Sequence, residues 1–567
     1  MANNSVVYTE KNNCQDCYKC IRECPVKAIK IESHSASIDQ DLCISCGHCT
    51  VVCPVGAKKV RDDLDKVKFF IKNKYKTIVS LAPSYNSEYS DYSDSQIISA
   101  IKSLGVTDVS ETALGAEIVS HEALNYLKDK DDGVFFSSCC PSIVSLICKY
   151  YPDYKSNLTP IMSPMIAHGK LLKKMYGEDT KIIFIGPCIA KKMEADEYNK
   201  YIDVVITFND LKRWMDDEFI NFSDFNTEIK NKFIPSKSTS GALFPIDGGM
   251  LTCMDPDAKT SDISLMSFSG VKNVEAALTN LNKAKIKGKI FIELMACEGG
   301  CINGPACNNN NSSIIKRHDV IASSEKISAE NSFYNIDIKL NYDNLKKISK
   351  NEYTEEQINE SLETVGKFSS ADELNCGGCG YESCRDFAKA MLDGKADRTM
   401  CVSYMRKVAH DKATVILHKI PSGIVIVNEN LKIIEANMNF AKLLGDEIIM
   451  IFKNDPGLEN ADIKKLLPFH KLFTSVLEYG EELIDKDVKI EEKNIQLSIV
   501  NIQKHKIVCA IIRDMRLPQV REDIVIERTR KVINENMKTV QKIAYLLGEN
   551  VSNTEAMLNS IIETHKP

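Results

Sequence analysis

The grouping of the cysteines constrains this chain more than any other feature of its sequence. There are 21 cysteines, and two runs of four share one spacing that ends in a proline. Runs of this kind hold two [4Fe-4S] clusters, and the fourth cysteine of each run ligates the other cluster. One cluster is expected on Cys14, Cys17, Cys20 and Cys53, and the other on Cys43, Cys46, Cys49 and Cys24. Structural zinc is the alternative, but zinc usually takes paired Cys-x2-Cys knuckles.

A further set of four cysteines is spread over three distant segments. They are Cys140, Cys188, Cys297 and Cys301. Four thiolates can hold one cubane iron–sulfur cluster. Gly299 and Gly300 stand directly before the last of these cysteines and allow the backbone to come close to a bulky inorganic centre.

Short apolar runs alternate with helical patterns through the same region. Four of these runs predict buried parallel strands, at residues 77–82, 133–136, 181–186 and 289–295. Each cysteine segment lies at or just beyond the end of such a run. Open α/β sheets place their ligands at the carboxyl ends of the strands. The strand pattern and the cysteines therefore predict the same site.

The three segments resemble the signature motifs of the [FeFe]-hydrogenase H-cluster domain, and the two N-terminal runs resemble a ferredoxin. The resemblance implies that Cys140, Cys188, Cys297 and Cys301 hold a [4Fe-4S] cubane. It also implies that the last thiolate bridges to a diiron subcluster with CO, cyanide and a dithiolate carrying an amine. The implied activity is the reversible oxidation of H2 to protons and electrons.

The resemblance assigns further residues to this site. Lys191 is expected to pair with one cyanide, because a buried ammonium needs an anion. Pro83 and Ser84 match the segment beside the other cyanide, and Phe244 matches an aromatic wall. Ordinary packing roles are equally consistent with Ser84 and Phe244.

A proton path is also implied. Cys139 stands where catalytic members of the family use a thiol to pass protons to the bridging amine, and a thiol beside a cluster can act as such a relay. Thr159 and Glu122 lie where an outward path could continue.

Three positions depart from the best-known hydrogen-producing members. Gly186 replaces a methionine, Met165 replaces a glutamine, and Glu298 replaces a proline. Such changes around a metal centre tune its potential and access. They indicate a less-studied or sensory branch.

A fourth cysteine group follows in the chain. Its members are Cys376, Cys379, Cys384 and Cys401. The spacing and its glycines resemble a small four-cysteine [4Fe-4S] module of corrinoid iron–sulfur proteins. Binding of a zinc ion by these four cysteines is the alternative.

The remaining segments contain no cysteine motif. Residues 412–516 alternate strands and helices in a manner that resembles a PAS sensor domain. The sequence does not identify a ligand for this domain. His418 and His470 are candidate ligand-binding residues but are better explained as surface or packed histidines. Residues 517–567 predict a helix whose apolar spacing is that of a coiled-coil seam, with packing against its own domain as the alternative.

These observations predict a multidomain chain of α/β and α+β class. Its parts are a ferredoxin-like 2[4Fe-4S] domain (1–65), an α/β H-cluster domain with parallel sheets (74–350), a four-cysteine module (355–408), a PAS α+β domain (412–516) and a signalling or dimerisation helix (517–567). The net charge of −6 gives no indication of nucleic acid as a partner. No apolar run approaches the ~20 residues of a membrane span, so a cytoplasmic protein is expected.

Three functions are consistent with this organisation. The first is a regulatory hydrogenase that reacts with H2. Its tail would form a homodimer and act through a separate kinase or phosphatase. The second is a metabolic hydrogenase that exchanges electrons with ferredoxin or another redox carrier. The third is an iron–sulfur scaffold or signalling protein without the diiron unit. The first two require maturation enzymes that build the diiron unit.

Overall fold

The computed structural model describes most of the chain. The described residues are 5–32, 35–225, 231–258, 262–281, 287–307, 311–324, 334, 336–342, 347–348, 351–490 and 493–515, with 533, 537 and 538. They form two compact units, residues 1–404 and 405–567. The helix predicted over 517–567 lies outside the described residues apart from those last three.

The N-terminal part of the first unit is built from short elements around the first two cysteine runs. Two antiparallel pairs, β1 with β4 and β2 with β3, enclose the helices α1 and α2. Their bounds are β1 Val7–Thr9, α1 Lys19–Glu23, β2 Ile29–Glu32, β3 Ser35–Ile38, α2 His48–Val52 and β4 Lys58–Val60. Each helix contains the third cysteine of one run, Cys20 in α1 and Cys49 in α2, and the fourth cysteine directly follows the helix.

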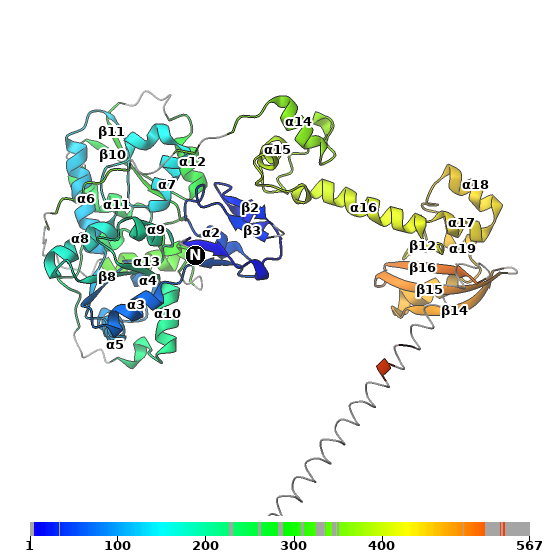
Figure 1. Cartoon of the computed structure of the whole chain (residues 1–567), viewed down its shortest axis with the longest axis horizontal. Helices are drawn as coiled ribbons and strands as arrows, with labels where there is room; N and C mark the ends of the chain where they lie inside the picture. The colour runs from blue at the N-terminus through cyan, green and yellow to red at the C-terminus, as the bar shows by residue number, and fades with distance from the viewer. Residues whose placement is uncertain are drawn as a thin grey trace, which may run out of the picture. The chain divides into compact units, whose positions relative to one another are not determined.

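Two parallel sheets form the larger part of the first unit (Figure 1). The first has the order β6-β5-β8-β9 and the second the order β10-β11-β7. Their bounds are β5 Thr77–Leu81, β6 Asp108–Glu111, β7 Gly133–Phe136, β8 Lys181–Gly186, β9 Val204–Thr207, β10 Ile263–Ser269 and β11 Lys289–Met295. The four predicted strands are confirmed, and all pairings in both sheets are parallel.

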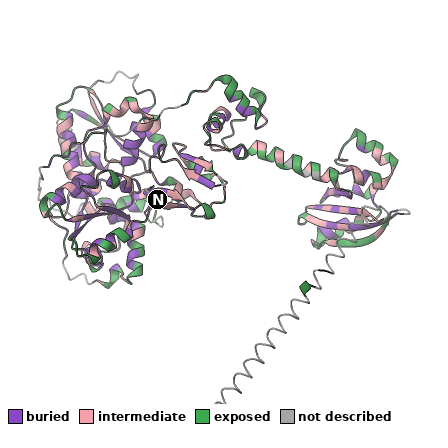
Figure 2. Cartoon of the chain, viewed as in Figure 1, coloured by how far each residue is buried: buried purple, intermediate pink, exposed green. Residues whose placement is uncertain are grey.

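Helices cover these sheets. They are α3 Leu64–Lys72, α4 Tyr85–Glu88, α5 Asp94–Ser103, α6 Ala113–Lys128, α7 Pro141–Tyr150, α8 Pro164–Tyr176, α9 Ala190–Glu197, α10 Phe208–Asp217, α11 Gly249–Ala258, α12 Val271–Leu278 and α13 Ser313–Ser324. Helices α7 and α8 begin with proline, which suits the first helical position because its missing N–H has no partner there. Burial concentrates on the strands and on the helix faces against them (Figure 2).

The fourth cysteine group lies in a small helical module at the end of the first unit. It contains α14 (Glu355–Glu363) and α15 (Cys384–Leu392), and α16 (Val402–Lys419) continues from it into the second unit. The module shares an apolar cluster with the N-terminal part, in which Tyr381 and Phe387 pack with Ile21. These two parts of the first unit are therefore in direct contact.

The second unit contains one antiparallel sheet with the order β13-β12-β16-β15-β14. Its elements are β12 Gly423–Asn428, β13 Ile433–Ala436, α17 Met438–Leu444, α18 Asp446–Asn454, α19 Ile463–Leu466, α20 His470–Tyr479, β14 Leu483–Ile490, β15 Lys493–Gln503 and β16 Ile507–Asp514. Strands and helices thus follow the α+β order expected from the sequence. The side chain of His418 lies outside the described residues, and Nδ1 of His470 contacts the carbonyl of Leu467 at 3.2 Å.

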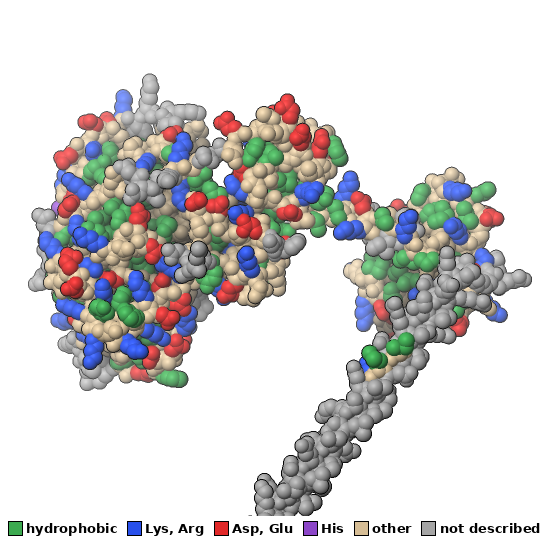
Figure 3. Space-filling model, viewed as in Figure 1, with side chains coloured by type: hydrophobic (Ala, Val, Ile, Leu, Met, Phe, Trp, Pro, Cys, Tyr) green, Lys and Arg blue, Asp and Glu red, His purple; other side chains and the backbone are tan. Residues whose placement is uncertain are grey.

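The surface of the molecule is mixed in charge. Acidic and basic side chains are interspersed over the face of the first unit seen in Figure 3. Within the described part of the chain, no helix combines the length and apolar character needed to cross a bilayer.

Candidate functional site

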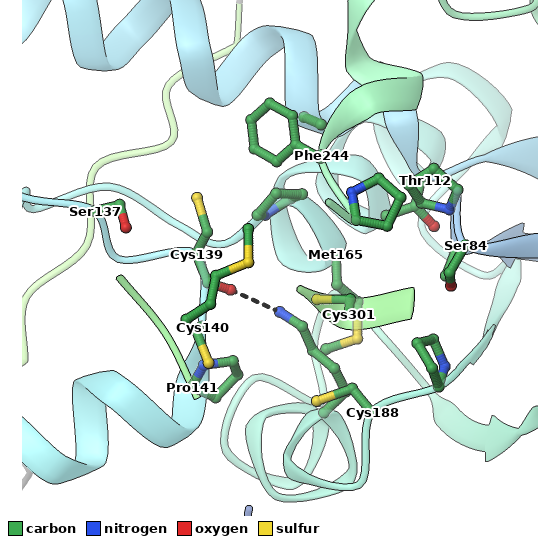
Figure 4. Close-up of a pocket in the computed structure, with 18 of the residues that line it drawn as sticks. Ser84, Thr112, Ser137, Cys139, Cys140, Pro141, Met165, Cys188, Phe244 and Cys301 are labelled. Atoms are coloured by element: carbon green, nitrogen blue, oxygen red, sulfur yellow. Dashed lines mark hydrogen bonds between the residues drawn. The ribbon is translucent and has the colours of Figure 1, made fainter. Parts of the chain in front are cut away.

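A cavity of about 100 Å³ lies where the carboxyl ends of the two parallel sheets meet (Figure 4). Its wall includes Ala82 after β5, Thr112 after β6, Ser137 after β7, Pro187 after β8 and Met295 at the end of β11. The cavity therefore lies at the carboxyl ends of the parallel strands, which is where the sequence predicted a site. The sequence did not indicate that the strands belong to two sheets facing one cavity.

Three of the four dispersed cysteines line this cavity, namely Cys140, Cys188 and Cys301. Cys297 is not in its wall, but burial raises its pKa well above the usual value and the neighbouring thiol of Cys301 adds to the rise. Burial likewise raises the pKa of Cys188 to about 11. Ionising such thiols is unfavourable unless a metal centre binds them, since coordination itself removes the proton.

The dispersed cysteines lie close to one another. Besides burial, the thiols of Cys188 and Cys140 raise the pKa of Cys301 and also that of Cys297. Among the described residues no group of three His, Cys, Asp or Glu side chains converges closely enough to hold one metal ion.

Gly300 shows why glycine precedes Cys301. Its φ is +103°, and a Cβ atom there would lie 2.4 Å from the carbonyl oxygen of Pro245. Only glycine permits both that conformation and that approach. The backbone carrying Cys301 therefore packs directly against the segment that supplies Phe244 to the cavity.

Lys191 lies in the cavity wall and is almost fully buried. Its Nζ donates to the Glu194 carboxylate at 2.7 Å and to the carbonyl oxygen of Cys139 at 3.4 Å, the dashed line in Figure 4. Burial opposes the charge, but Glu194 and the thiol of Cys188 outweigh it and raise the pKa of Lys191. The cavity thus contains a permanent cation.

Cys139 also lines the cavity, with its Sγ 3.7 Å from the sulfur of Met250. Burial raises the pKa of Cys139, and the nearby Glu293 carboxylate raises it further. The thiol therefore keeps its proton at neutral pH in the absence of a ligand.

Glu293 is a site residue that the sequence reasoning missed. It lies on β11, is 2% exposed and lines the cavity. Its Oε1 accepts a hydrogen bond from the Met250 backbone at 3.2 Å, while Oε2 has no partner. Burial raises the pKa of Glu293 to about 8. Its position could have been noticed in the sequence, because Glu293 is the one acidic residue inside an otherwise apolar strand.

The structure brings most of the remaining expected residues to the cavity. Pro83, Ser84, Met165 and Phe244 all line it. The Ser84 hydroxyl is buried without a hydrogen-bond partner, so it is free to donate to a ligand.

Two expected residues do not reach the cavity wall. Thr159 contacts the Ser138 hydroxyl at 3.1 Å and donates to the Phe136 carbonyl at 3.1 Å. Glu122 is half-buried on α6, and within the described residues it makes no hydrogen bond or ion pair. Their part in a proton path stays a prediction without a contact to Cys139.

The departures from the better-known members have different surroundings. A Cβ at Gly186 would lie 2.8 Å from Ala82 and from the ring of Phe184. Phe184, itself in the cavity wall, therefore occupies the space that a larger residue at 186 would need. Glu298 is exposed.

Thiols of the first two cysteine runs lie near one another, and their assignment to two clusters stays a prediction. Burial raises the pKa of Cys20 to about 11, with Cys14, Cys17 and Cys53 among its neighbours. Burial raises the pKa of Cys46 to about 12, and the thiols of Cys24 and Cys140 add to the rise. One group therefore adjoins the cavity cysteines. Gly47 makes that approach possible, because a Cβ there would lie 2.5 Å from Ile189.

The module cysteines are only partly gathered. Burial raises the pKa of Cys379, with Cys401 and Cys376 as neighbouring thiols. Cys384 begins α15 and packs with Ile358 and Leu362. Its place beside the other three stays a prediction.

Comparison with known proteins agrees with this geometry. Residues 75–305 match the iron only hydrogenase large subunit, C-terminal domain. Residues 13–57 of the chain match a 4Fe-4S dicluster domain, and residues 372–403 match a family described by its Fe-S cluster. The chain thus contains a hydrogenase-type domain and iron–sulfur domains.

Individual relatives are distant. Iron hydrogenase 1 of Clostridium pasteurianum is 27% identical over 319 residues, which are 47% of this chain and 56% of that protein. The cytosolic Fe-S cluster assembly factor NAR1 of Debaryomyces hansenii is 26% identical over 206 residues, 33% of this chain and 38% of that protein. The chain therefore spans little more than half of the first relative and less of the second. A solved [FeFe]-hydrogenase HydA1 from Chlamydomonas reinhardtii has 17% identity and a TM-score of 0.37, covering 49% of this chain and 89% of that one.

Proposed function

We propose that this chain is an [FeFe]-hydrogenase-like protein that catalyses or senses the reversible oxidation of H2 to protons and electrons. The observation that carries the proposal is the joint presence of Cys140, Cys188, Cys301, Lys191 and Cys139 on one enclosed cavity. A cubane alone would need only thiolates. A buried cation and a non-ligating thiol beside it favour a second, anionic group in the same space.

The residues fit the cofactor of such an enzyme. Cys140, Cys188, Cys297 and Cys301 would hold the [4Fe-4S] cubane, with the last thiolate shared with a diiron subcluster. When bound, that subcluster with its CO, cyanide and dithiolate supplies the H2 chemistry. Lys191 and the free hydroxyl of Ser84 offer one cation and one donor for its anionic ligands.

Proton movement falls to Cys139 and Glu293. Because burial keeps both protonated near neutral pH, each can hold a proton at a defined atom, the Sγ of the thiol and a carboxyl oxygen. A carboxyl group with a pKa near the working pH gives and takes protons most readily. Oε2 of Glu293 has no competing hydrogen bond.

Electrons would pass through the N-terminal clusters. The Cys140 thiol is close enough to Cys46 to raise the pKa of Cys46, which supports direct transfer between the second cluster and the cubane. On the opposite side, the Tyr18 hydroxyl contacts that of Thr399 at 3.0 Å and Gly380 packs on Arg22. This contact supports an onward step to the module. A further relay to a PAS domain over residues 412–516 is part of the proposal.

We further propose that the protein is cytoplasmic and regulatory, with the tail over residues 517–567 as a dimerisation helix acting on a separate kinase or phosphatase. Truncation after Met515 tests this role. H2 oxidation should survive the truncation while the regulatory response is lost. Loss of H2 oxidation itself would contradict the regulatory role.

Infrared spectroscopy under H2, after co-expression with maturation enzymes, tests the proposed chemistry. We expect CO and cyanide bands that change with H2. A high turnover with ferredoxin would instead favour the metabolic hydrogenase.

The match to the assembly factor NAR1 favours a second candidate, an iron–sulfur scaffold without the diiron unit. Complete absence of CO and cyanide bands in fully matured protein, with the cubane present, would support the scaffold and overturn the proposed activity.

A further inference from the structure

A chain of hydrogen bonds runs from the cavity wall into the core. The Thr112 hydroxyl lies 2.7 Å from that of Ser80, and the Ser80 hydroxyl lies 2.8 Å from Nδ1 of His168. Nε2 of His168 lies 2.9 Å from the Ser110 hydroxyl. Thr112 is 4% exposed and the other three residues are fully buried. Thr112 alone among the four lines the cavity (Figure 4).

Close helix packing places His168 in this chain. Ser80 lies on β5, Ser110 on β6 and His168 on α8. A Cβ at Gly115 on α6 would lie 2.2 Å from the Pro164 carbonyl and 2.8 Å from Cβ of His168. Because position 115 is glycine, α8 can approach closely enough to insert the imidazole between two strand serines.

The imidazole is neutral, since burial lowers the pKa of His168 to about 3. A neutral imidazole has one N–H donor and one acceptor nitrogen. Its tautomer therefore sets the direction of the whole chain. If Nδ1 carries the proton, His168 donates to Ser80 and Ser80 donates to Thr112. If Nε2 carries it, each of those bonds is reversed.

The hydrogen-bond partners available to the Ser110 hydroxyl decide between the two tautomers of His168. Among the described residues its hydroxyl has no partner except Nε2 of His168. In the Nε2–H tautomer the Ser110 proton would be buried without an acceptor, which is unfavourable. In the Nδ1–H tautomer Ser110 donates to Nε2, and the one proton left over belongs to Thr112 at the cavity wall.

We propose that His168 is a positioning residue that makes Thr112 a hydrogen-bond donor to the contents of the cavity. The group facing Thr112 is then a lone-pair acceptor, and a ligand of the diiron unit fits that description; this part rests on the proposed function. Thr112 joins Lys191 and Ser84 as donors, while Glu293 is the carboxyl group on the same wall. The cavity is thus built for an anionic group with acceptors on its surface.

The tautomer is measured directly by NMR on the full chain labelled with 15N-histidine, with no need for the diiron unit. The signal of His168 is the one lost in His168→Gln. His505 provides an internal reference, because its Nδ1 lies 2.9 Å from the Leu477 carbonyl and must donate when neutral. We expect His168 to show the same Nδ1–H pattern. An Nε2–H pattern would overturn the proposal.

A second measurement tests the acceptor. In matured protein, Thr112→Val removes the donor, leaves more electron density on iron and should shift the CO infrared bands to lower frequency; Thr112→Ser should restore them. Bands unmoved by Thr112→Val would overturn the assignment of Thr112 as a donor to the cofactor. A parent protein without CO or cyanide bands would overturn the proposed function, and the NMR result would still decide the direction of the chain.

Discussion

Ser267 of β10 lies directly opposite Glu293 of β11 in the parallel sheet. The Ser267 hydroxyl donates to the carboxylate of Asp247, and Ser269 donates to the same carboxylate at 3.0 Å. Asp247 and both serines line an open hollow of about 560 Å³, whereas Glu293 lines the buried cavity. Besides burial, the charge of Asp247 contributes to the raised pKa of Glu293, so the carboxyl group in the cavity lies near this polar hollow.

Replacement of Glu293 by Gln should slow proton movement. The amide keeps the volume and one acceptor but cannot release a proton at neutral pH. We expect H2 oxidation by matured protein to fall by about 10²-fold, the usual effect of losing a positioned acid or base. Glu218→Gln, at an exposed position on the same unit, is the control. Equal turnover in the two variants would exclude Glu293 from the path.

The same substitution should change how stability depends on pH. Burial raises the pKa of Glu293 from 4.5 to about 8, so the folded state binds a proton that the unfolded chain has lost. This contribution to stability is complete below the unfolded pKa and disappears as the pH rises through about 8. Gln lacks the loss. The Tm of Glu293→Gln relative to the parent should therefore increase between about pH 5 and pH 8; a constant difference would contradict the buried ionisation.

Gly300 should not tolerate a side chain. Gly300→Ala combines a φ of +103° with a clash against the Pro245 carbonyl, and we expect loss of cubane iron. Gly288→Ala is the matched control, since its φ is +84° but no atom of the described residues lies within 4 Å of the added Cβ. That control should lose only about 1 kcal/mol through its backbone. Iron content and visible absorption measure both variants, and normal iron in Gly300→Ala would refute the close-approach argument.

Glu194 should matter less once the cofactor is bound. Glu194→Gln leaves the buried ammonium of Lys191 without its carboxylate, and removal of one partner of a buried pair typically costs about 3–5 kcal/mol. An anionic ligand in the cavity would replace the lost partner. We therefore expect a large drop in Tm without the diiron unit and a smaller one in matured protein. Equal drops would show that Lys191 does not pair with the cofactor.

The contact between the module and the N-terminal clusters can be opened at one glycine. A Cβ at Gly380 would lie 2.7 Å from Cα of Arg22, so Gly380→Ala should separate the two parts. Gly394→Ala is the matched control, because Gly394 also has a positive φ but no atom of the described residues lies within 4 Å of the added Cβ. Magnetic coupling between reduced clusters, measured by EPR, should weaken only in the first variant. Unchanged coupling would contradict the idea that this contact sets the distance between the clusters.

Local sequence patterns were sufficient to predict the parallel strands, and cysteine spacing alone gave the proposed cluster ligands. Cysteine spacing is covalent information, and the apolar runs of β5, β7, β8 and β11 are continuous because both faces of those strands are buried. The positions of Cys140, Cys188 and Lys191 just after strands also followed from the order of elements. Ser84 and Phe244, which the family resemblance suggested, both line the cavity, and their roles there stay predictions.

Only the tertiary structure decided what surrounds those ligands. Glu293 and Phe184 lie on different strands and Thr112 directly follows a third, and they meet because the ends of two separate sheets converge on one cavity. His168 joins them only through the close approach of α8 to α6 at Gly115. Sequence spacing contains no such information, because each of these contacts joins segments whose distance is set by packing. The sequence thus determines which cysteines fall into cluster-type spacings, while the fold determines which polar groups share the cavity with three of them, because those contacts depend on packing between distant segments.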